Sequence, residues 1–415
     1  MINQSDIAIV IAGYNRDGAL KRVLQSISNA ELSTYTNITL YISLDNSGND
    51  HCKIVADEFV WTKGKKICIN QTHRLGLKEH IYTCASLSQK HDAIILLEDD
   101  LYVSPFFYDF AQQAISFYSD DRSVAGIALY SYNYCEFALC PFEALNDGHD
   151  NYFIQVPCSW GQIWTKQQWK DFEEYRNSGT NTSIEEQLPA AAQSWPKQSS
   201  WKREFFCYMI ETDKYFVHPR ISLSTNYGDI GQHFTNDVLV WQTPLLAGKK
   251  TFSFSELVSS CSVYDSFFEL HPKALNRIMK SETDVCIDLN GLKPLKNVTS
   301  KFLISSKRCT KPIKKFETGL YPYENNIIFN RETSASESMG FSLGEVADFE
   351  SDIEFKRMDS DVRRVFFKPE LVAYSFINEV YNSATYKAGK IVTKPFRFIR
   401  KIIRNRNTGN NKNRY

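Results

Sequence analysis

The stretch that most constrains the fold covers residues 93–101 and reads Ala-Ile-Ile-Leu-Leu-Glu-Asp-Asp-Leu. Five apolar residues lead directly into three acids, and a Ser-Pro turn follows at residues 104–105. An apolar run of this length, bounded by turn residues, predicts a strand that is buried on both faces of a parallel sheet. Parallel sheets bind ligands at the carboxyl ends of their strands, and adjacent carboxylates repel one another unless a cation lies among them. Glu98, Asp99 and Asp100 therefore predict a cation site at this edge, and a solvated acidic loop is the alternative.

Strands and helices alternate along the first hundred residues. Apolar runs at residues 6–12, 39–44 and 66–69 predict strands, and an amphipathic helix is predicted at residues 20–27, after the first of them. Regular alternation of this kind predicts a parallel sheet covered by helices, which is an α/β fold. Asp45 comes directly after the second strand, where an acid is well placed to hydrogen-bond a ribose or a base.

The composition is that of a globular protein, but the charge is unevenly distributed. The 415 residues are 43% hydrophobic and 23% charged, with equal numbers of acids and bases, which fits about two globular domains. Residues 387–415 hold ten Lys or Arg and no acid, so the rest of the chain is acidic. The ten cysteines show no metal-ligand spacing, and we expect free thiols in a reducing cytoplasm. We also expect neither a signal peptide nor a membrane-spanning helix.

Aromatic residues gather downstream of the acidic run. Residues 156–164 read Val-Pro-Cys-Ser-Trp-Gly-Gln-Ile-Trp, and Trp-Pro-Lys, Pro-Arg-Ile-Ser and a Gly-rich segment follow in that order. Aromatic faces suit the C–H faces of sugar rings, and an indole N–H can bond sugar hydroxyls. Packing of Trp160 and Trp164 in the core is the alternative interpretation.

Taken in order, these motifs resemble the nucleotide-sugar half of GT-A fold glycosyltransferases. The Tyr-Asn-Arg turn after the first strand, the aspartate after the second, Arg-Leu-Gly-Leu at residues 74–77 and Leu-Glu-Asp-Asp-Leu at residues 97–101 occur in that family's order. The chain is similar to bacterial family-2-like enzymes and to the eukaryotic N-acetylglucosaminyltransferase I group, over about residues 5–240. The resemblance implies a Rossmann-like, mixed and mostly parallel sheet flanked by helices. No GxGxxG or GxxxxGK(S/T) sequence is present, which argues against a dehydrogenase or a P-loop protein.

The resemblance also implies a role for each motif. It implies that Mn²⁺ or Mg²⁺ binds at Asp100, in the manner of a DXD motif, and bridges the phosphates of a nucleotide sugar, with His233 as a second candidate ligand. The donor would be bound by Ala12, Tyr14, Arg16, Asp45, His73, Arg74, Glu98, Asp99 and Asp100. The acceptor would be bound by Trp160, Gly161 and Trp164.

An inverting transfer, which the resemblance implies, needs a general base that takes the proton of the acceptor hydroxyl. Where the eukaryotic group carries Asp-Asp-Trp after Trp-Pro-Lys, this chain has Ser-Ser-Trp at residues 199–201. The candidate bases are therefore Glu204, Glu211 and Asp213, which follow on or just after the same predicted helix. The alternative is that these three are acids on the surface of that helix.

The chain is predicted to have three parts, beginning with a GT-A domain over residues 1–250. Residues 251–385 contain short strand-like runs, such as Asn326–Phe329, between Ser-rich stretches, and predict a smaller α+β or mainly β accessory region. Residues 386–415 are a basic tail, and residues 387–404 mix apolar and basic residues as in an amphipathic helix that binds anionic lipid. A disordered extension is the alternative for the tail. We expect no nucleic-acid partner, because nothing in the rest of the chain supports one.

These features lead to one functional hypothesis and two alternatives. The hypothesis is a metal-dependent glycosyltransferase that moves a sugar, with UDP as the expected carrier, onto a glycan such as a lipid-linked O-antigen or capsule unit. It would act in the cytoplasm, at the inner face of the cytoplasmic membrane. The alternatives are a sugar-phosphate nucleotidyltransferase and a non-catalytic carbohydrate-binding module of the same fold. The sequence leaves the donor sugar, the linkage and the oligomeric state open.

Overall fold

The structure is a computed structural model that describes residues 4–179, 182–229, 240–333 and 340–354. The chain divides into two compact units, residues 1–357 and 358–415, and every described residue belongs to the first. The predicted membrane-binding segment, residues 387–404, lies outside the described residues. Within the described ranges, none of the helices has the length and apolar character needed to cross a membrane. All ten cysteines are free, as their spacing predicted.

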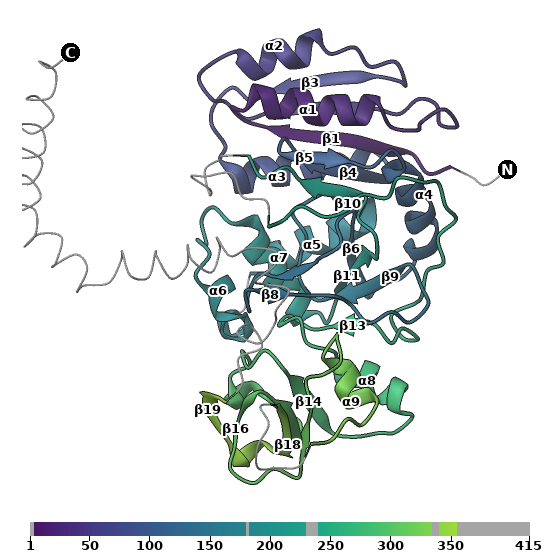
Figure 1. The fold of residues 1–415 in the computed structure, drawn as a ribbon. Coiled ribbons are helices and arrows are strands. Elements are labelled where there is room, and N and C mark those ends of the chain that lie inside the picture. The colour runs from purple at the N-terminus through teal and green to yellow at the C-terminus, as the bar shows by residue number, and fades with distance from the viewer. Residues whose placement is uncertain (1–3, 180–181, 230–239, 334–339, 355–415) are drawn as a thin grey trace, which may run out of the picture. The chain divides into compact units, whose positions relative to one another are not determined.

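The amino-terminal part of the chain forms the predicted alternation of strands and helices (Figure 1). Its elements are β1 (Ile7–Gly13), α1 (Asp17–Ser28), β2 (Leu40–Leu44), α2 (His51–Glu58), β3 (Lys66–Asn70), α3 (Leu77–Ala85), the 3-10 helix η1 (Ser86–Lys90) and β4 (Ala93–Glu98). β1 pairs in parallel with β2 and β4, and β2 pairs in parallel with β3. Every residue of β1 and β2 is buried, which is why these strands appear in the sequence as continuous apolar runs. α1 buries Leu20, Val23, Leu24 and Ile27, so the predicted amphipathic helix is confirmed.

The chain after residue 100 supplies the rest of the large sheet and two separate two-stranded sheets. The elements are β5 (Leu101–Val103), α4 (Phe107–Tyr118), β6 (Val124–Ala128), β7 (Tyr134–Cys135), β8 (Cys140–Pro141), β9 (Asn151–Ile154), β10 (Gln162–Thr165), α5 (Lys166–Ser178), η2 (Thr182–Gln187), α6 (Ala190–Gln193), α7 (Trp201–Glu211), β11 (Tyr215–Pro219), β12 (Ser224–Asn226) and β13 (Val263–Tyr264). Nine of the strands form one sheet in the order β13-β9-β11-β6-β10-β4-β1-β2-β3.

The large sheet is mixed, with parallel pairings in the majority. β10 runs antiparallel to both β4 and β6, and β9 runs antiparallel to β11, whereas the other pairings are parallel. Helices pack against it: α2 contacts β2 and β3, α3 contacts β1 and β4, and α5 contacts β6 and β10. The predicted Rossmann-like, mostly parallel sheet flanked by helices is confirmed.

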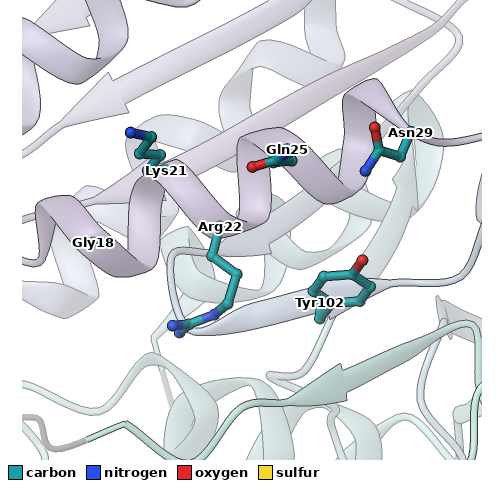
Figure 2. Close-up of a pocket in the computed structure, with 6 residues that line it drawn as sticks. All are labelled: Gly18, Lys21, Arg22, Gln25, Asn29 and Tyr102. Atoms are coloured by element: carbon teal, nitrogen blue, oxygen red, sulfur yellow. The ribbon is translucent and has the colours of Figure 1, made fainter.

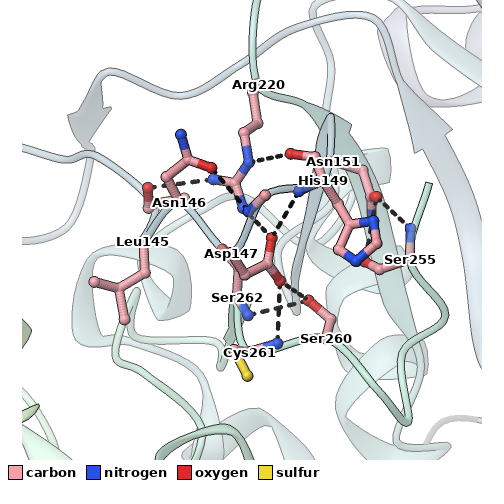
Figure 3. A network of polar contacts seen from close by, with 12 residues as sticks. Leu145, Asn146, Asp147, His149, Asn151, Arg220, Ser255, Ser260, Cys261 and Ser262 are labelled. Carbon is pink, nitrogen blue, oxygen red and sulfur yellow. Dashed lines mark hydrogen bonds and ion pairs between the residues drawn. The ribbon is translucent and has the colours of Figure 1, made fainter. Parts of the chain in front are cut away.

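A polar network fastens the chain near residue 260 to the large sheet (Figure 3). Arg220 directly follows β11, and its Nη2 is 2.7 Å from Asp147 Oδ1 while its Nε donates to the His149 carbonyl at 2.6 Å. Asp147 Oδ2 accepts from Ser260 Oγ at 2.8 Å and from the Cys261 N–H at 3.1 Å. The network leads into β13, which pairs with β9. A strand from beyond residue 250 thus joins the large sheet, and the predicted domain boundaries at residues 250 and 385 stay predictions.

A second, smaller sheet follows β13 and forms the predicted α+β region. Its elements are α8 (Pro272–Met279), β14 (Val285–Asp288), η3 (Leu295–Asn297), β15 (Phe302–Ser305), β16 (Lys307–Cys309), β17 (Lys314–Phe316), α9 (Glu324–Ile328), β18 (Phe341–Glu345), η4 (Val346–Asp348) and β19 (Phe349–Ile353). Four strands form the order β14-β15-β18-β17, and β16 pairs with β19. The strand predicted at Asn326–Phe329 is wrong, because its first three residues lie in α9 and Phe329 is the C-cap of that helix. Asn326 Nδ2 donates to the Leu320 carbonyl at 2.8 Å and to the Tyr323 carbonyl at 3.0 Å. The prediction failed because an apolar run of this length is compatible with either a strand or a helix.

Candidate functional site

The acidic run ends at the carboxyl edge of the large sheet. Glu98 is the last residue of β4 and lies opposite Ala12 of β1. Asp99 and Asp100 form the turn into β5, and β5 pairs with β12. The backbone N–H of Tyr227 donates to the Asp100 carbonyl at 2.8 Å. The three acids are therefore held between two parallel strands of the large sheet and the short β5–β12 ribbon.

Arg16 places a positive charge between the two aspartates. Its Nη2 hydrogen-bonds the Asp99 carboxylate and lies 3.2 Å from Asp100 Oδ2. Burial raises the pKa of Asp99 to about 6, even though Arg16 acts to lower it. Burial and the neighbouring charges of Asp100 and Asp99 raise the pKa of Glu98. One arginine thus leaves the negative charge of this edge only partly neutralised, which suits a further cation.

The oxygen atoms of this edge fit a divalent ion that binds together with phosphate. Mg²⁺ and Mn²⁺ prefer oxygen ligands, and nucleotide sites commonly hold Mg²⁺ through one or two carboxylates, substrate phosphates and water. No cluster of three or more metal-ligating His, Cys, Asp or Glu side chains occurs in the part of the chain that the structure describes. In the predicted role of Asp100, this residue would supply one ligand, and a diphosphate and water would supply the others. His233, the second predicted ligand, lies outside the described residues.

Asp45 organises the loop that carries His73 and Arg74. Its carboxylate accepts hydrogen bonds from the backbone N–H groups of residues 75 and 76, at 2.7 and 3.0 Å. Arg74 lies over the ring of Tyr14, with its guanidinium carbon 5.0 Å from the ring centroid. His73 and Arg74 are exposed, whereas Asp45 is buried. The structure thus brings the predicted donor residues, which lie at or after the ends of β1, β2, β3 and β4, to one edge of the sheet. Asp45 shapes that edge through the backbone.

The two tryptophans predicted to bind the acceptor have different environments. Trp164 has no exposed surface and packs 5.1 Å from Trp169, measured between ring centroids. It is a core residue without surface open to an acceptor, which corrects its predicted role. Trp160 is partly exposed, and its ring lies 4.7 Å from that of Tyr130 and 5.0 Å from that of Trp241. Of the two, Trp160 alone presents a ring surface.

Gly161 has a conformational role between Trp160 and β10. Its φ is +88°, in the region that favours glycine. A Cβ at this position would lie 3.0 Å from Ser224 Oγ and 3.3 Å from Leu129 Cβ. Glycine therefore allows the chain to turn close to β12, and the predicted acceptor contact of Gly161 stays a prediction.

Glu204, the first candidate base, faces α3 and is fully engaged there. Tyr82 Oη donates to its carboxylate at 2.8 Å, Lys78 Nζ lies 2.7 Å away and Arg176 Nε lies 3.5 Å away. Burial acts to raise the pKa of Glu204, but the hydrogen bonds from Lys78 and Tyr82 lower it overall. A carboxylate with three partners and a lowered pKa is a poor proton acceptor, so we do not assign the base to Glu204.

Glu211 and Asp213 lie at the far end of α7. Glu211 accepts from Tyr175 Oη at 2.8 Å, and Asp213 accepts from Tyr215 Oη at 3.1 Å. With a rise of 1.5 Å per residue, Glu211 is about 15 Å from the start of the helix. The start of α7 is the end that approaches Trp160, so the structure does not bring these two acids to the acidic edge.

Two residues that the sequence did not single out lie at the start of α7. Lys202 Nζ is 2.7 Å from Glu136 Oε1, and it lies over the rings of Trp195 and Trp160, 4.9 and 5.6 Å from their centroids. Glu136 belongs to the turn between β7 and β8. Glu136 and Lys202 are 66 residues apart in the sequence, and no periodic pattern predicts a contact over that separation. The Trp-Pro-Lys stretch at residues 195–197 was the one sequence feature near Lys202 that could have indicated this site.

A separate shallow pocket of about 390 Å³ opens on the outer face of α1 (Figure 2). It is lined by Gly18, Lys21, Arg22, Gln25, Asn29 and Tyr102. Arg22 is ion-paired with Asp229 and stacks 3.7 Å from the centroid of the Tyr227 ring. None of the predicted donor, acceptor, metal or base residues lines this pocket, so we assign no part of the reaction to it.

Residues 8–140 match the model of glycosyl transferase family 2. The matched region runs from β1 to the start of β8, and so it contains the acidic edge, Arg16 and Asp45. This confirms the family-2-like GT-A resemblance for roughly the first third of the chain. No curated protein matches the chain.

Several solved structures resemble part of the chain. GalNAc-T7 with UDP, GalNAc and Mn²⁺ is 14% identical with a TM-score of 0.37, over 53% of this chain and 43% of that one. S. aureus TarS 1-349 in complex with UDP-GlcNAc is 8% identical with a TM-score of 0.38, over 55% and 60%. The mannosyltransferase PcManGT from Pyrobaculum calidifontis, in complex with GDP-Man and Mn²⁺, is 8% identical with a TM-score of 0.32, over 53% and 58%. The similar region thus spans about half of each of these proteins.

Proposed function

We propose, with the family 2 match over residues 8–140 as the premise, that this chain is a metal-dependent glycosyltransferase. It transfers a sugar from a nucleotide diphosphate sugar, with UDP as the nucleotide, to a hydroxyl group of a glycan acceptor. The observation that carries the proposal is the acidic edge, where Arg16 is shared between Asp99 and Asp100 while Glu98 lies beside them. Such an arrangement suits a divalent ion that arrives with a diphosphate.

Different residues at this edge are proposed to bind different parts of the donor. Tyr14 and Arg74 offer a ring face and a guanidinium plane to the base and ribose, beside the loop that Asp45 holds in place. His73 lies in the same loop. Arg16 presents a cation where the diphosphate would lie, and guanidinium groups bind phosphate oxygens through paired hydrogen bonds.

Glycosyl transfer builds negative charge on the departing nucleotide diphosphate, and the edge is arranged to stabilise it. A divalent ion, when bound, supplies Lewis-acid stabilisation of that charge. Asp100 is the proposed protein ligand, Asp99 lies on the ribose side and Glu98 faces the donor sugar. Arg16 adds a fixed positive charge beside the same phosphates.

The acceptor is proposed to bind on the side of Trp160 and to be a lipid-linked surface polysaccharide unit. The partly exposed ring of Trp160, packed on Trp241, offers an aromatic face to a sugar. The basic and apolar residues of the segment 387–404 suit an anionic membrane surface. The reaction is proposed to proceed with inversion at the cytoplasmic face of that membrane.

The first test measures thermal unfolding of the full chain with UDP, GDP and CMP sugars, with and without Mn²⁺. We expect one nucleotide class to stabilise the protein only with Mn²⁺, by about 2.7 kcal/mol when the ligand is at 100 times its Kd. Asp100→Ala should remove the Mn²⁺-dependent part of the response while the protein alone unfolds near its original temperature. An unchanged response in Asp100→Ala would sink the metal assignment, and no response of the native chain to any nucleotide would sink the proposal.

A non-catalytic carbohydrate-binding module of the same fold is the second candidate. It is favoured by one observation, the three partners that engage Glu204 at the position nearest to the expected base. This candidate predicts binding of nucleotide sugars without release of nucleotide, which a coupled assay for UDP or GDP distinguishes from transfer.

A further inference from the structure

The chain before β10 is held directly beside the acidic edge. β10 pairs antiparallel with β4, with Gln162 opposite Leu96, so residues that precede Gln162 lie beside residues that follow Leu96. Trp160 therefore lies next to the end of β4, where Glu98 is. Ser224 Oγ, on the strand that pairs with β5, donates to the Trp160 carbonyl at 2.6 Å. The register of β10 on β4 thus places Trp160 beside Glu98, and the Ser224 side chain fixes the Trp160 carbonyl.

Glu136 and Lys202 lie over this tryptophan. The 2.7 Å contact between Lys202 Nζ and Glu136 Oε1 is largely shielded from solvent, with 12% and 16% of the two side chains exposed. Lys202 stacks over Trp160 and Trp195, and Trp160 in turn stacks on Trp241. The pair therefore projects onto a group of indole rings of the kind that bind sugar rings.

The charge of Lys202 links this pair to the acidic edge. Glu98, Lys202 and Glu136 all act on the pKa of the buried Cys158 thiol, which burial raises. These electrostatic effects agree with the strand registers, because both place the pair near the position proposed for the donor sugar.

We propose that Glu136 is the general base of the transfer and that Lys202 is its positioning residue; the inference rests on the proposed function. Glu136 Oε1 is bound by Lys202, and Oε2 has no hydrogen-bond partner among the residues described, so it can accept a proton. The acceptor oxygen forms a bond to the anomeric carbon, whose bond to the phosphate oxygen breaks with its electron pair leaving on the nucleotide diphosphate. The hydroxyl proton passes to Glu136 Oε2.

Glu136 meets the requirements that Glu204, Glu211 and Asp213 do not. Glu204 is engaged by three partners on the α3 side of α7, and the other two lie at the far end of that helix. The proposal also explains how the site can have a base although residues 199–200 are serines. The carboxylate of Glu136 comes from the turn between β7 and β8 and reaches the start of α7, where it contacts Lys202. Lys202 is one residue beyond Trp201, at the first turn of that helix.

The test uses the full chain with Mn²⁺ and measures nucleotide release from UDP-glucose, UDP-GlcNAc, UDP-GalNAc and GDP-mannose, with water or azide as acceptor. Glu136→Gln should keep the Kd for UDP with Mn²⁺ within about two-fold and lower release to water about 100-fold or more. Azide carries no hydroxyl proton, so it should restore release by Glu136→Gln to near the native rate. Glu143→Gln is the matched control, since Glu143 is an exposed glutamate seven residues further along, and it should behave like the native protein.

Lys202 is tested by the same measurements. Lys202→Met should lower release to water and recover with azide, and Lys202→Arg should retain most of the native rate because it keeps the positive charge. Native-like release by Glu136→Gln, or a loss that azide does not restore, would overturn the assignment. A native chain that binds UDP with Mn²⁺ but releases nucleotide from none of the four donors would overturn it while leaving nucleotide binding intact. Failure to bind any nucleotide would refute the proposed function, and the base with it.

Discussion

Among single residues, Arg16 shows most directly how local charge shapes the candidate site. Asp99 is 3% exposed, and a buried carboxylate without a partner is strongly unfavourable. Arg16, whose side chain is 25% exposed, bonds Asp99 and approaches Asp100. It therefore stabilises the edge of the protein when no ligand is bound, and in the proposed function it would present a cation to an incoming phosphate. The family resemblance predicted Arg16 as a donor-binding residue, and only the fold showed that it pairs with the acidic run.

Replacing Arg16 with glutamine should destabilise the protein by about 3 kcal/mol, because it leaves a buried carboxylate without its counter-charge. Urea unfolding in the presence of EDTA measures this change. Arg122→Gln is the control, since Arg122 pairs with Asp171 on the surface with 65% of its side chain exposed, and its loss should cost about 0.5 kcal/mol. Equal effects of the two substitutions would contradict the stabilising role of Arg16.

Among the elements, β11 places a buried histidine, His218, within the aromatic core. His218 has no exposed surface, and its Nδ1 lies 2.6 Å from the Tyr130 carbonyl. Its ring lies 5.1 Å from that of Tyr132 and 5.3 Å from that of Tyr152. Burial lowers the pKa of His218 to about 3. The imidazole is therefore neutral in the folded protein over the ordinary pH range and has a packing role.

This lowered pKa predicts a loss of stability in acid. The unfolded chain, with a His pKa near 6.5, binds more protons than the folded protein between about pH 3 and 6.5, so stability falls as the pH falls through that window. Between pH 6.5 and 5 the loss from His218 is about 2 kcal/mol. Urea unfolding measures the free energy of unfolding at pH 6.5 and at pH 5. The difference between the two values should be smaller in His218→Phe than in the native protein, by about 2 kcal/mol. The same pH difference in both proteins would refute the assignment of the acid sensitivity to His218.

At the scale of the whole molecule, the basic tail is separated in sequence from an acidic body. Deleting residues 387–415 should abolish co-sedimentation with vesicles that contain phosphatidylglycerol, because each basic residue near an anionic surface contributes about 1 kcal/mol. Thermal stabilisation by UDP with Mn²⁺ should be unaffected, since the proposed donor-binding residues lie within residues 12–100. Vesicles of phosphatidylcholine alone are the control for the full chain and should bind it weakly. Undiminished binding of the truncated chain to anionic vesicles would refute the membrane proposal.

The sequence by itself determined the features that depend on neighbours along the chain. Buried parallel strands must be apolar throughout, so β1, β2 and β4 were readable from their residues, and the acids that follow β4 had to lie at the ligand edge. The spacing of the apolar residues likewise predicted α1. The short run in α9 was misassigned, because local pattern does not distinguish a brief strand from a helical turn.

Only the tertiary structure decided which distant residues meet. The antiparallel insertion of β10 between β4 and β6 sets Trp160 beside Glu98 and buries Trp164, although the two tryptophans are four residues apart and look alike in the sequence. The contact of Glu136 with Lys202 joins a hairpin to the start of a helix. The position of Glu204 in the sequence suggested a general base, but in the fold its carboxylate pairs with Lys78 and Arg176. The packing of the elements decides which distant side chains come into contact, and such contacts produce no periodic pattern in a single sequence. The acidic edge was therefore predictable, and its proposed base was not.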